Sequence, residues 1–395
     1  MTTITIAYPT DPLGVVPGGT DTCIRDILRC APDDITMQLV GVTTNPAEYK
    51  VGQWNKANIR GTNFNFFPLM AVKDLNTQMR IPLSVKFTLK LFNSDSLKNS
   101  DVIQFNRIEP ALAALKNKQP KIVILHQNMN VLRNKNSDIR WKYLPGLYFW
   151  VESLILRKIR EIFIVREDAV VEYKERFPEK KNEIHFLPTW MNPDLFYFQA
   201  DKKTAQKLIC NEFGLPVEGE LMIFVGRFDH QKDPILLIES VAEAFKLRPD
   251  GKLILIGDGV LKQQVIEKIA EHKLTDRIKL IGAQSQESVA KYLRASDLLL
   301  LSSAYEGMPR CVVESLGSGV PVVTTNAGEV TLLVHNDSNG YIVEERDARI
   351  FGGFINKALD KVLELRGKPC VDAVDEYRDE VVLKKLYTTY RELAK

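Results

Sequence analysis

Two glutamates with seven residues between them, Glu306 and Glu314, are the first side chains that could do chemistry. They follow Leu298–Leu301, an apolar run of the length of a buried strand, and they span a predicted loop and the start of a helix. A helix that begins just after a strand presents free N–H groups, which attract phosphate. Carboxylates repel phosphate but accept hydrogen bonds from the hydroxyl groups of a ribose or a sugar. This stretch therefore predicts a binding site for a nucleotide-sugar.

Two cations form a second candidate group. Arg227 and Lys232 follow the predicted strand Leu221–Val225, so they lie in a loop at its carboxyl end. Ligands of parallel sheets bind beyond the carboxyl ends of the strands. An arginine fork and a lysine point charge at that edge suit a diphosphate. Solvent-facing cations are the ordinary alternative, but the strand context favours the diphosphate.

The segment Glu306-Gly307-Met308-Pro309, followed by Glu314, resembles the E-x7-E motif of retaining glycosyltransferases of the GT-B fold, most closely glycosyltransferase family 4. The resemblance implies an α/β fold with two Rossmann-like, doubly wound parallel-sheet domains that face each other across a cleft. It also implies a retaining, metal-independent transfer from a UDP- or GDP-linked sugar to a glycan or lipid-linked acceptor, in polysaccharide or glycolipid synthesis. No cofactor is expected besides this co-substrate.

The resemblance further implies roles for individual residues. Glu306 and His126 are the catalytic candidates: Glu306 positions the sugar, and His126, which ends the apolar run Ile122–Leu125, supports the reacting centre by hydrogen bonding. A covalent intermediate through Glu306 is an open alternative, and a purely structural role is the alternative for His126. The expected donor-binding residues are Gly18, Gly19, Arg227, Lys232, Gly257, Asp258, Gly282, Gly307, Met308, Pro309, Arg310 and Glu314. No metal ligand is expected.

Three segments depart from the family pattern. Arg166 stands where the family has Ser, and Pro188–Asn192 replaces a segment that usually reads Pro-Asn-Gly-Val-Asp. Ala327-Gly328 replaces the common Gly-Gly, which keeps the second glycine. The first two departures leave the acceptor and the finer donor contacts open.

Strand and helix patterns alternate through both halves of the chain, which is typical of parallel, doubly wound sheets. The glycines after the first strand do not form G-x-G-x-x-G, so a dinucleotide fingerprint is absent. Further strands are expected at Ile4–Tyr8, Met37–Val42, Val102–Phe105, Lys121–His126, Ile162–Val165, Lys252–Ile256, Ile278–Ile281, Val320–Thr324 and Gly340–Val343.

The length of 395 residues predicts two domains. The apolar pattern gives way to the polar segment Gln199–Lys203. We therefore expect an N-terminal acceptor-binding domain over residues 1–200 and a C-terminal donor-binding domain over residues 201–375. Val371–Lys395 reads as a charged amphipathic helix, of which residues 376–395 are expected to pack back on the N-terminal domain.

The net charge of +3 is too small to indicate a nucleic-acid partner. Basic residues nevertheless cluster, because the stretch from Arg80 to Lys142 holds 12 Lys and Arg against 4 Asp and Glu. Arg80–Phe92 and Arg140–Arg160 combine cations with apolar and aromatic side chains, a pattern that suits the surface of an anionic membrane. Core helices with a solvated cationic face are the alternative.

The cysteines are scattered and form no C-x-x-C pair, so free thiols in a reducing compartment are expected. They are Cys23, Cys30, Cys210, Cys311 and Cys370. No signal peptide is recognised, and no apolar run reaches the roughly 18–20 residues of a membrane span. A cytoplasmic location is expected, with peripheral contact at the inner face of the membrane as an addition.

Other functions remain open at the level of sequence. A sugar-nucleotide epimerase of the GT-B fold would use the same donor, and a phosphorylase would need a pyridoxal lysine, for which the sequence gives no specific signal. A non-catalytic protein that binds a nucleotide-sugar is a third class. The charged set of Arg227, Lys232, Glu306 and Glu314 argues against the third class.

Overall fold

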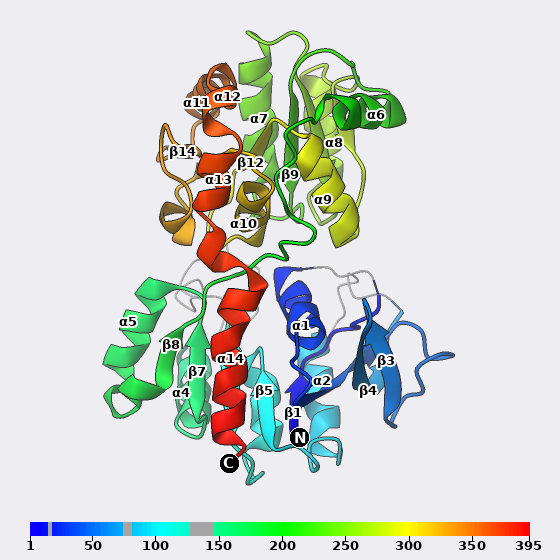
Figure 1. Ribbon diagram of the computed structural model, residues 1–395, viewed down its shortest axis with the longest axis vertical. Helices are drawn as coiled ribbons and strands as arrows, with labels where there is room; N and C mark the ends of the chain where they lie inside the picture. Colours follow the sequence, from blue (N-terminus) through cyan, green and yellow to red (C-terminus); the bar gives the residue numbers. More distant parts are fainter. Residues whose placement is uncertain (15–17, 74–80, 127–144) are drawn as a thin grey trace. The chain divides into compact units, whose positions relative to one another are not determined.

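The computed structural model describes residues 1–14, 18–73, 81–126 and 145–395. They form two units, shown in Figure 1: Met1–Pro188 together with Asp379–Lys395, and Thr189–Arg378. Each unit is a largely parallel sheet covered by helices, which confirms the predicted α/β fold class. The part of the predicted Arg140–Arg160 stretch that precedes residue 145 lies outside the described residues.

The sheet of the first unit has the order β3-β4-β2-β1-β5-β6-β7-β8 over the described residues. Neighbouring strands pair in parallel, except that β3 and β4 form an antiparallel hairpin. Sequence patterns predicted five of these strands to within two residues and missed β3, β4 and β8. The strands are β1 (Thr2–Ala7), β2 (Ile35–Thr43), β3 (Asn55–Ile59), β4 (Thr62–Ala71), β5 (Val102–Phe105), β6 (Lys121–Leu125), β7 (Glu161–Ile164) and β8 (Ile184–Phe186).

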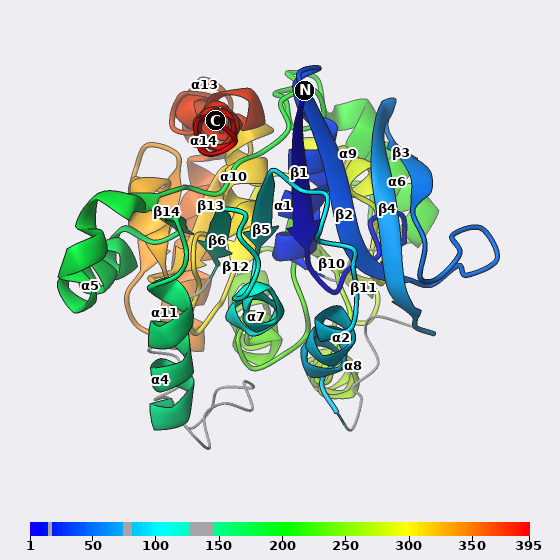
Figure 2. The same ribbon diagram turned by 90° about the horizontal axis from the view of Figure 1, so that it is seen from below.

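Helices cover both faces of this sheet. Figure 2 shows α2 and α4 on one side and α14 on the other. Phe87 of α2 and Ile155 of α4 join Val123 of β6 in one buried cluster. On the opposite face the hydroxyl of Tyr387 in α14 donates to the carbonyl of Ile27 in α1 at 2.8 Å. The helices are α1 (Gly19–Arg29), α2 (Leu83–Phe92), α3 (Ile108–Ala111), α4 (Pro145–Leu156), α5 (Glu167–Arg176) and α14 (Asp379–Leu393).

The C-terminal segment differs from its prediction. A single helix over Val371–Lys395 is wrong, because α14 begins only at Asp379 and is preceded by the short helix α13 (Lys368–Asp372) and a 3-10 turn. The reason is a backbone contact within the second unit: the N–H of Met191 donates to the carbonyl of Tyr377 at 2.9 Å, and Met191 forms a parallel bridge with Arg378. Arg378 is held in an extended conformation there, which interrupts the helix.

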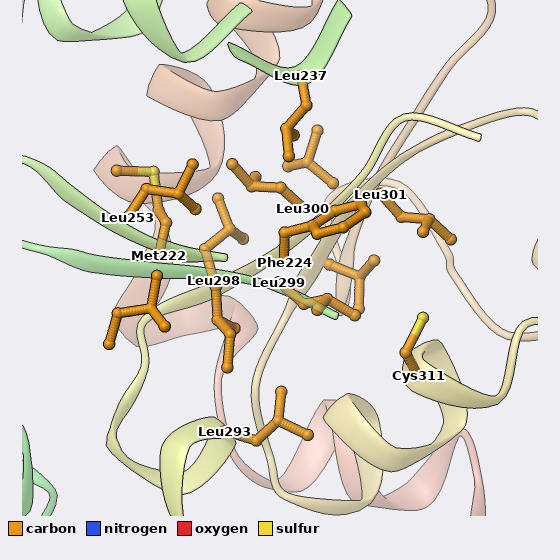
Figure 3. Packing of buried hydrophobic residues seen from close by; sticks show 14 of the residues in the cluster. Met222, Phe224, Leu237, Leu253, Leu293, Leu298, Leu299, Leu300, Leu301 and Cys311 are labelled. Carbon is orange, nitrogen blue, oxygen red and sulfur yellow. The ribbon is translucent and has the colours of Figure 1, made fainter. Parts of the chain in front are cut away.

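The sheet of the second unit is entirely parallel and has the order β11-β10-β9-β12-β13-β14. Its central strands are largely buried on both faces, which explains their near-continuous apolar sequences. Figure 3 shows the side chains of Leu298–Leu301 between Leu237 of α7 and Leu293 of α9. The strands are β9 (Leu221–Val225), β10 (Lys252–Ile256), β11 (Ile278–Leu280), β12 (Leu298–Leu301), β13 (Val322–Thr325) and β14 (Gly340–Val343).

Helices also pack against the sheet of the second unit. Helix α6 ends at Gly214, whose φ of 61° is the left-handed conformation of a glycine cap. The five cysteines are free thiols, as predicted. Besides α13, the helices are α6 (Lys203–Phe213), α7 (Pro234–Phe245), α8 (Lys262–Glu271), α9 (Gln286–Ala295), α10 (Arg310–Gly317), α11 (Ala348–Asp360) and α12 (Val362–Leu365).

Candidate active site

The strand order of the second unit reverses at the pair β9 and β12. These neighbours run in parallel, so the loops that follow them leave the same edge of the sheet. A reversal of this kind is where open α/β sheets bind ligands. Arg227 and Lys232 lie in the loop after β9, and Glu306 lies in the loop after β12. The topology therefore brings the predicted cations and the first predicted carboxylate to one place.

Lys232 and Glu306 form a buried ion pair. The Nζ atom of Lys232 lies 2.5 Å from Oε1 of Glu306, and the two side chains are 15% and 6% exposed. The Ser303 hydroxyl donates to the same oxygen at 2.6 Å, and Nε2 of Gln231 lies 3.4 Å from Oε2. Because both carboxylate oxygens are engaged, the orientation of Glu306 is fixed by neighbouring side chains.

The charge state of Lys232 depends on this pair. Burial alone would lower the pKa of Lys232, but the Glu306 carboxylate beside it outweighs burial, and the pKa is raised. The nearby Cys311 behaves differently, because burial raises the pKa of its thiol to about 12. The site thus holds a charged lysine next to a neutral thiol.

Arg227 stands at the solvent side of this group. Its Nη2 atom lies 3.0 Å from Asp229 and 3.3 Å from Oε1 of Gln231, which in turn contacts Glu306. The Arg227 side chain is 55% exposed, so its guanidinium remains accessible to an anionic ligand. Lys232 is the inner cation and Arg227 the outer one.

The loop from Gly307 to Pro309 is held by its backbone. The carbonyl of Gly307 accepts from the N–H of Glu329 at 2.9 Å, and the carbonyl of Met308 accepts from the Thr189 hydroxyl at 3.1 Å. Pro309 is the N-cap of α10 and not its first helical residue, since its ψ of 111° is extended. Arg310 begins the helix, so the helix start lies directly after the Glu306 loop, as expected.

Glu314 lies inside α10 and is partnered within its own helix. Arg310 Nε donates to Oε1 of Glu314 at 2.7 Å, and both side chains are nearly buried. This i,i+4 pair was not part of the expected donor contacts. The Arg310 guanidinium and the Glu314 carboxylate therefore neutralise each other at the start of α10.

The turn after β10 packs against the loop of Arg227. Gly257 has a φ of 148°, and a Cβ atom added there would lie 1.8 Å from the carbonyl oxygen of Gly226. Its N–H donates to the carbonyl of Gly282 at 3.0 Å. Asp258 is exposed and pairs with Lys262 at 2.8 Å. Gly257 and Gly282 therefore shape the edge of the site, whereas the Asp258 carboxylate is held by Lys262 at the start of α8.

The remaining predicted residues belong to the first unit. Gly18 is the N-cap of α1 and Gly19 its first residue, and neither requires a conformation reserved for glycine. Asp21 in the first turn is buried, and burial raises the pKa of its carboxyl group. His126 follows β6, and its Nε2 lies 2.9 Å from Nδ2 of Asn106. Arg166, a departure from the family pattern, pairs with Asp168.

Sequence reasoning missed three residues that support this site. Ser303 and Gln231 fix Glu306, and Arg346 donates to the carbonyls of Ser302 and Ser303 at 3.0 and 2.7 Å. The position of Ser303 just after a predicted strand could have indicated a role. The sequence gives no sign of the role of Arg346, because this residue is distant from the loop in sequence and reaches it only in the folded chain. Among the described residues no group of three or more potential metal ligands is found.

Comparison with known proteins gives matches for both the second unit and the whole fold. Residues 206–369 match the family described as Glycosyl transferases group 1. The chain is 27% identical over 234 residues to UDP-Gal:alpha-D-GlcNAc-diphosphoundecaprenol alpha-1,3-galactosyltransferase of Escherichia coli, covering 58% of this chain and 59% of the relative. It is 34% identical over 136 residues to the putative teichuronic acid biosynthesis glycosyltransferase TuaC of Bacillus subtilis, covering 34% and 32%. The aligned regions thus span 59% and 32% of these two relatives.

Solved structures resemble the chain over its full length. Sucrose-phosphate synthase from Thermosynechococcus elongatus superposes with a TM-score of 0.81 at 20% identity, covering 100% of this chain and 99% of that one. Anabaena HepE, solved in complex with UDP-glucose, superposes with a TM-score of 0.73 at 16% identity, covering 99% and 100%. These similarities confirm the GT-B fold of two parallel-sheet α/β domains.

Proposed function

We propose that this chain, whose second unit matches the Glycosyl transferases group 1 family, is a glycosyltransferase that moves a sugar from a nucleoside diphosphate sugar to a glycan or lipid-linked acceptor. The observation that carries the proposal is the Lys232–Glu306 pair at the strand-order reversal, beside the start of α10. A cation, a carboxylate and a helix N-terminus at one edge suit the diphosphate and the sugar of such a donor.

Each group of the site has a task in this proposal. Arg227, Lys232 and the backbone N–H groups of Gly307–Arg310 stabilise the charge that grows on the leaving diphosphate. Glu306 accepts hydrogen bonds from the sugar, and Glu314 accepts them from the ribose. When the diphosphate arrives beside Lys232, Ser303 and Gln231 keep Glu306 in place.

Retention of configuration is part of the proposal, and the E-x7-E spacing of Glu306 and Glu314 supports it. The acceptor attacks the face that the diphosphate leaves, and the leaving phosphate takes the acceptor's proton. A covalent intermediate through Glu306 is the alternative route to the same product. Proton NMR of the first-formed product gives its anomeric configuration, and an inverted anomer would overturn this part.

Independence from metal ions is likewise proposed, since Arg227, Lys232 and the start of α10 supply positive charge at the diphosphate position. Transfer is expected to proceed undiminished in EDTA. Complete loss in EDTA with recovery on addition of Mg²⁺ would contradict this scheme.

The decisive experiment is a thermal-shift screen of nucleoside diphosphates and their sugars, followed by transfer assays with the best donor. A ligand that binds the folded state raises its apparent stability by mass action. The shift is expected with the wild type and not with Lys232→Ala. Lys246→Ala is the matched control, because Lys246 pairs with Glu243 on the exposed side of α7. Equal shifts in all three proteins would place the donor elsewhere.

Two rival functions give different results in the same assays. A sugar-nucleotide epimerase would convert the donor without an acceptor. A non-catalytic binding protein would show the thermal shift but no turnover across a panel of acceptors. The charged pair of Lys232 and Glu306 favours the transferase over the binding protein.

We also propose that the first unit contacts an anionic membrane through α2 and α4. Both helices contact α3 on the same side of the sheet, and each presents an apolar row to solvent at helical spacing. Leu89 is 59% exposed and Trp150 is 61% exposed. The row of α2 consists of Val85, Leu89 and Phe92, with Ile81 just before the helix, and the row of α4 consists of Leu147, Trp150 and Leu154.

The charges around these rows support a negatively charged partner. Helix α2 carries Lys86 and Lys90 and no acidic residue. The acidic residue of α4, Glu152, is buried, where it accepts from the Tyr173 hydroxyl at 2.6 Å and pairs with Arg176. The apolar faces of α2 and α4 therefore expose no carboxylate, a pattern that suits an anionic bilayer surface. No described helix is both long and apolar enough to cross a membrane.

Vesicle flotation tests this contact. Wild-type protein is expected to float with vesicles containing phosphatidylglycerol at low salt, and binding is expected to fall as salt screens the charges. The double variant Leu89→Ser/Trp150→Ser should lose most of this binding, whereas Val171→Ser, an exposed valine on α5, should not. Failure of the wild type to float at low salt would overturn the membrane contact and leave the transferase proposal untouched.

A further inference from the structure

A line of hydrogen bonds runs from the C-terminal helix to His126. The hydroxyl of Tyr390 in α14 donates to Oε1 of Gln104, and Nε2 of Gln104 donates to Oδ1 of Asn106 at 3.0 Å. Nδ2 of Asn106 then lies 2.9 Å from Nε2 of His126. Tyr390, Gln104 and Asn106 are buried, so water does not compete for the first two contacts, and His126 is partly exposed at the end of the line.

The sheet explains why these residues form a line. Gln104 belongs to β5 and Asn106 follows two residues later, so both side chains point to the same face. His126 directly follows β6, which pairs with β5 in parallel, so Asn106 and His126 lie at the same edge. Helix α14 covers this face of the sheet and contacts β1, the other neighbour of β5.

Each amide in the line can point in only one direction. The Tyr390 hydroxyl has a single hydrogen, and among the described residues its hydrogen-bond partner is Oε1 of Gln104. Turning the Gln104 amide over would leave this buried hydrogen without an acceptor, a costly arrangement. Oε1 is therefore fixed toward Tyr390, and Nε2 is fixed toward Asn106. Asn106 must then present its own N–H group to His126.

We propose that Tyr390, Gln104 and Asn106 are positioning residues that hold His126 as the neutral tautomer with its proton on Nδ1. Nε2 of His126 accepts from Asn106, so the proton must be on the other ring nitrogen. No hydrogen bond from a described residue occupies Nδ1. The ring thus keeps one N–H donor for an oxygen of the substrate, and this last step rests on the proposed transferase function.

The environment of His126 agrees with a neutral ring. Burial lowers the pKa of His126 to about 4, so the imidazole carries no charge at neutral pH. The position of the proton is then decided by hydrogen bonding alone. Because the line begins on α14, residues that lie 286 positions apart in the sequence together set the chemistry of this ring.

The direct test reverses the line with an isosteric change. In Gln104→Glu the new carboxylate at pH 8 can only accept, so Asn106 must turn its N–H group toward residue 104 and its oxygen toward His126. We expect the His126 proton to move from Nδ1 to Nε2. Long-range ¹H–¹⁵N NMR of the imidazole distinguishes the two tautomers. Retention of the Nδ1–H form in this variant would overturn the proposal.

Two tyrosines of α14 provide a matched pair. Tyr390→Phe removes the hydroxyl that orients Gln104, so the amides of Gln104 and Asn106 can adopt either orientation. A signal from His126 with its proton on Nε2 should then appear in the NMR spectrum. Tyr387→Phe also removes a buried hydroxyl bond, to the carbonyl of Ile27, but leaves the line intact. It should retain the Nδ1–H form. Identical spectra for the two variants would show that the line has no orienting effect.

Kinetics then connect the tautomer to the reaction. Gln104→Glu should lower kcat by about tenfold or more with little change in KM for the donor, the pattern of a lost transition-state contact. Tyr387→Phe should leave kcat unchanged. A tautomer change without any change in kcat would refute the substrate contact of His126. If the wild type transferred no sugar at all, the proposed function would be wrong. The NMR experiment would still test the hydrogen-bond line, because it does not depend on activity.

Discussion

At the scale of single residues, the Lys232–Glu306 pair makes the clearest prediction. Removing one partner leaves the other charge buried without this counter-ion, which costs about 3–5 kcal/mol. Lys232→Ala and Glu306→Ala should each lower the free energy of unfolding by this order, and the double variant should lose less than the sum. Urea denaturation measures all three. Strict additivity would show that the two charges do not interact in solution.

Both single variants should also lose activity. A preorganised charge at the leaving group contributes roughly 10²–10³ in rate, so kcat/KM should fall by at least this order. Assays are run well below the melting temperature so that folded protein is compared. Lys246→Ala, which breaks an exposed pair, should keep wild-type activity. Near-normal transfer by both Lys232→Ala and Glu306→Ala would remove this pair from the proposed mechanism.

His126 gives a prediction about pH. Its pKa in the folded protein is about 4, below the value of about 6.5 in an unfolded chain. Between these pH values the unfolded state binds more protons, so the stability contributed by the neutral ring is lost as pH falls from 6.5 toward 4. The loss amounts to about 3 kcal/mol at most. His126→Gln should flatten the dependence of unfolding free energy on pH in this window; an unchanged slope would contradict the assignment.

At the scale of elements, the Glu306 loop depends on a neighbouring glycine. Gly328 has a φ of 68°, and a Cβ atom there would lie 2.1 Å from the carbonyl oxygen of Gly307. Gly328→Ala should therefore displace the loop, weaken donor binding by about tenfold and cost more than about 1 kcal/mol. Calorimetric titration with the donor and thermal unfolding measure the two effects.

The control for this change lies in α11. Gly353 is exposed within a helix, and a Cβ atom there meets nothing within 4 Å. Gly353→Ala should stabilise the protein by up to about 1 kcal/mol and leave donor affinity unchanged. Equal losses of affinity in both variants would mean that Gly328 has no special influence on the loop.

Elements were predictable where burial dictates the sequence. β12 is four leucines between two helix layers, and its predicted bounds are confirmed. β3 was missed because its sequence is polar and its hairpin turn uses Arg60-Gly61 in place of Asn-Gly. In the site, the strand ends predicted the loops of Lys232 and Glu306. The Tyr390–Gln104 contact spans 286 positions in sequence, and no local pattern indicates it.

At the scale of the whole molecule, the two units should differ in their ability to fold alone. Residues 189–378 form one continuous segment with its own core, whereas the first unit includes α14 from the far end of the chain. Leu386 and Tyr390 of α14 are fully buried. The isolated segment 189–378 should therefore fold cooperatively and bind the donor, and residues 1–188 alone should not fold stably.

A rejoined chain controls this experiment. Met191 lies beside Arg378, so the two crossings between the units are close together, and a short Gly-Ser linker can join residue 188 to residue 379. This rejoined first unit should show a cooperative thermal transition in circular dichroism. Stable folding of residues 1–188 without α14 would show that the helix contributes little to the first unit.

Because the chain passes between the two units twice, it also determines the order in which the units can be completed during translation. Asp379–Leu393 is translated only after the entire second unit, so the nascent first unit lacks one of the helices that cover its sheet until the second unit has been made. A chaperone that shields apolar surfaces would bind the incomplete first unit during this interval. Premature stop codons just before Asp379 would release a chain in which the second unit is folded and the first unit is susceptible to proteases.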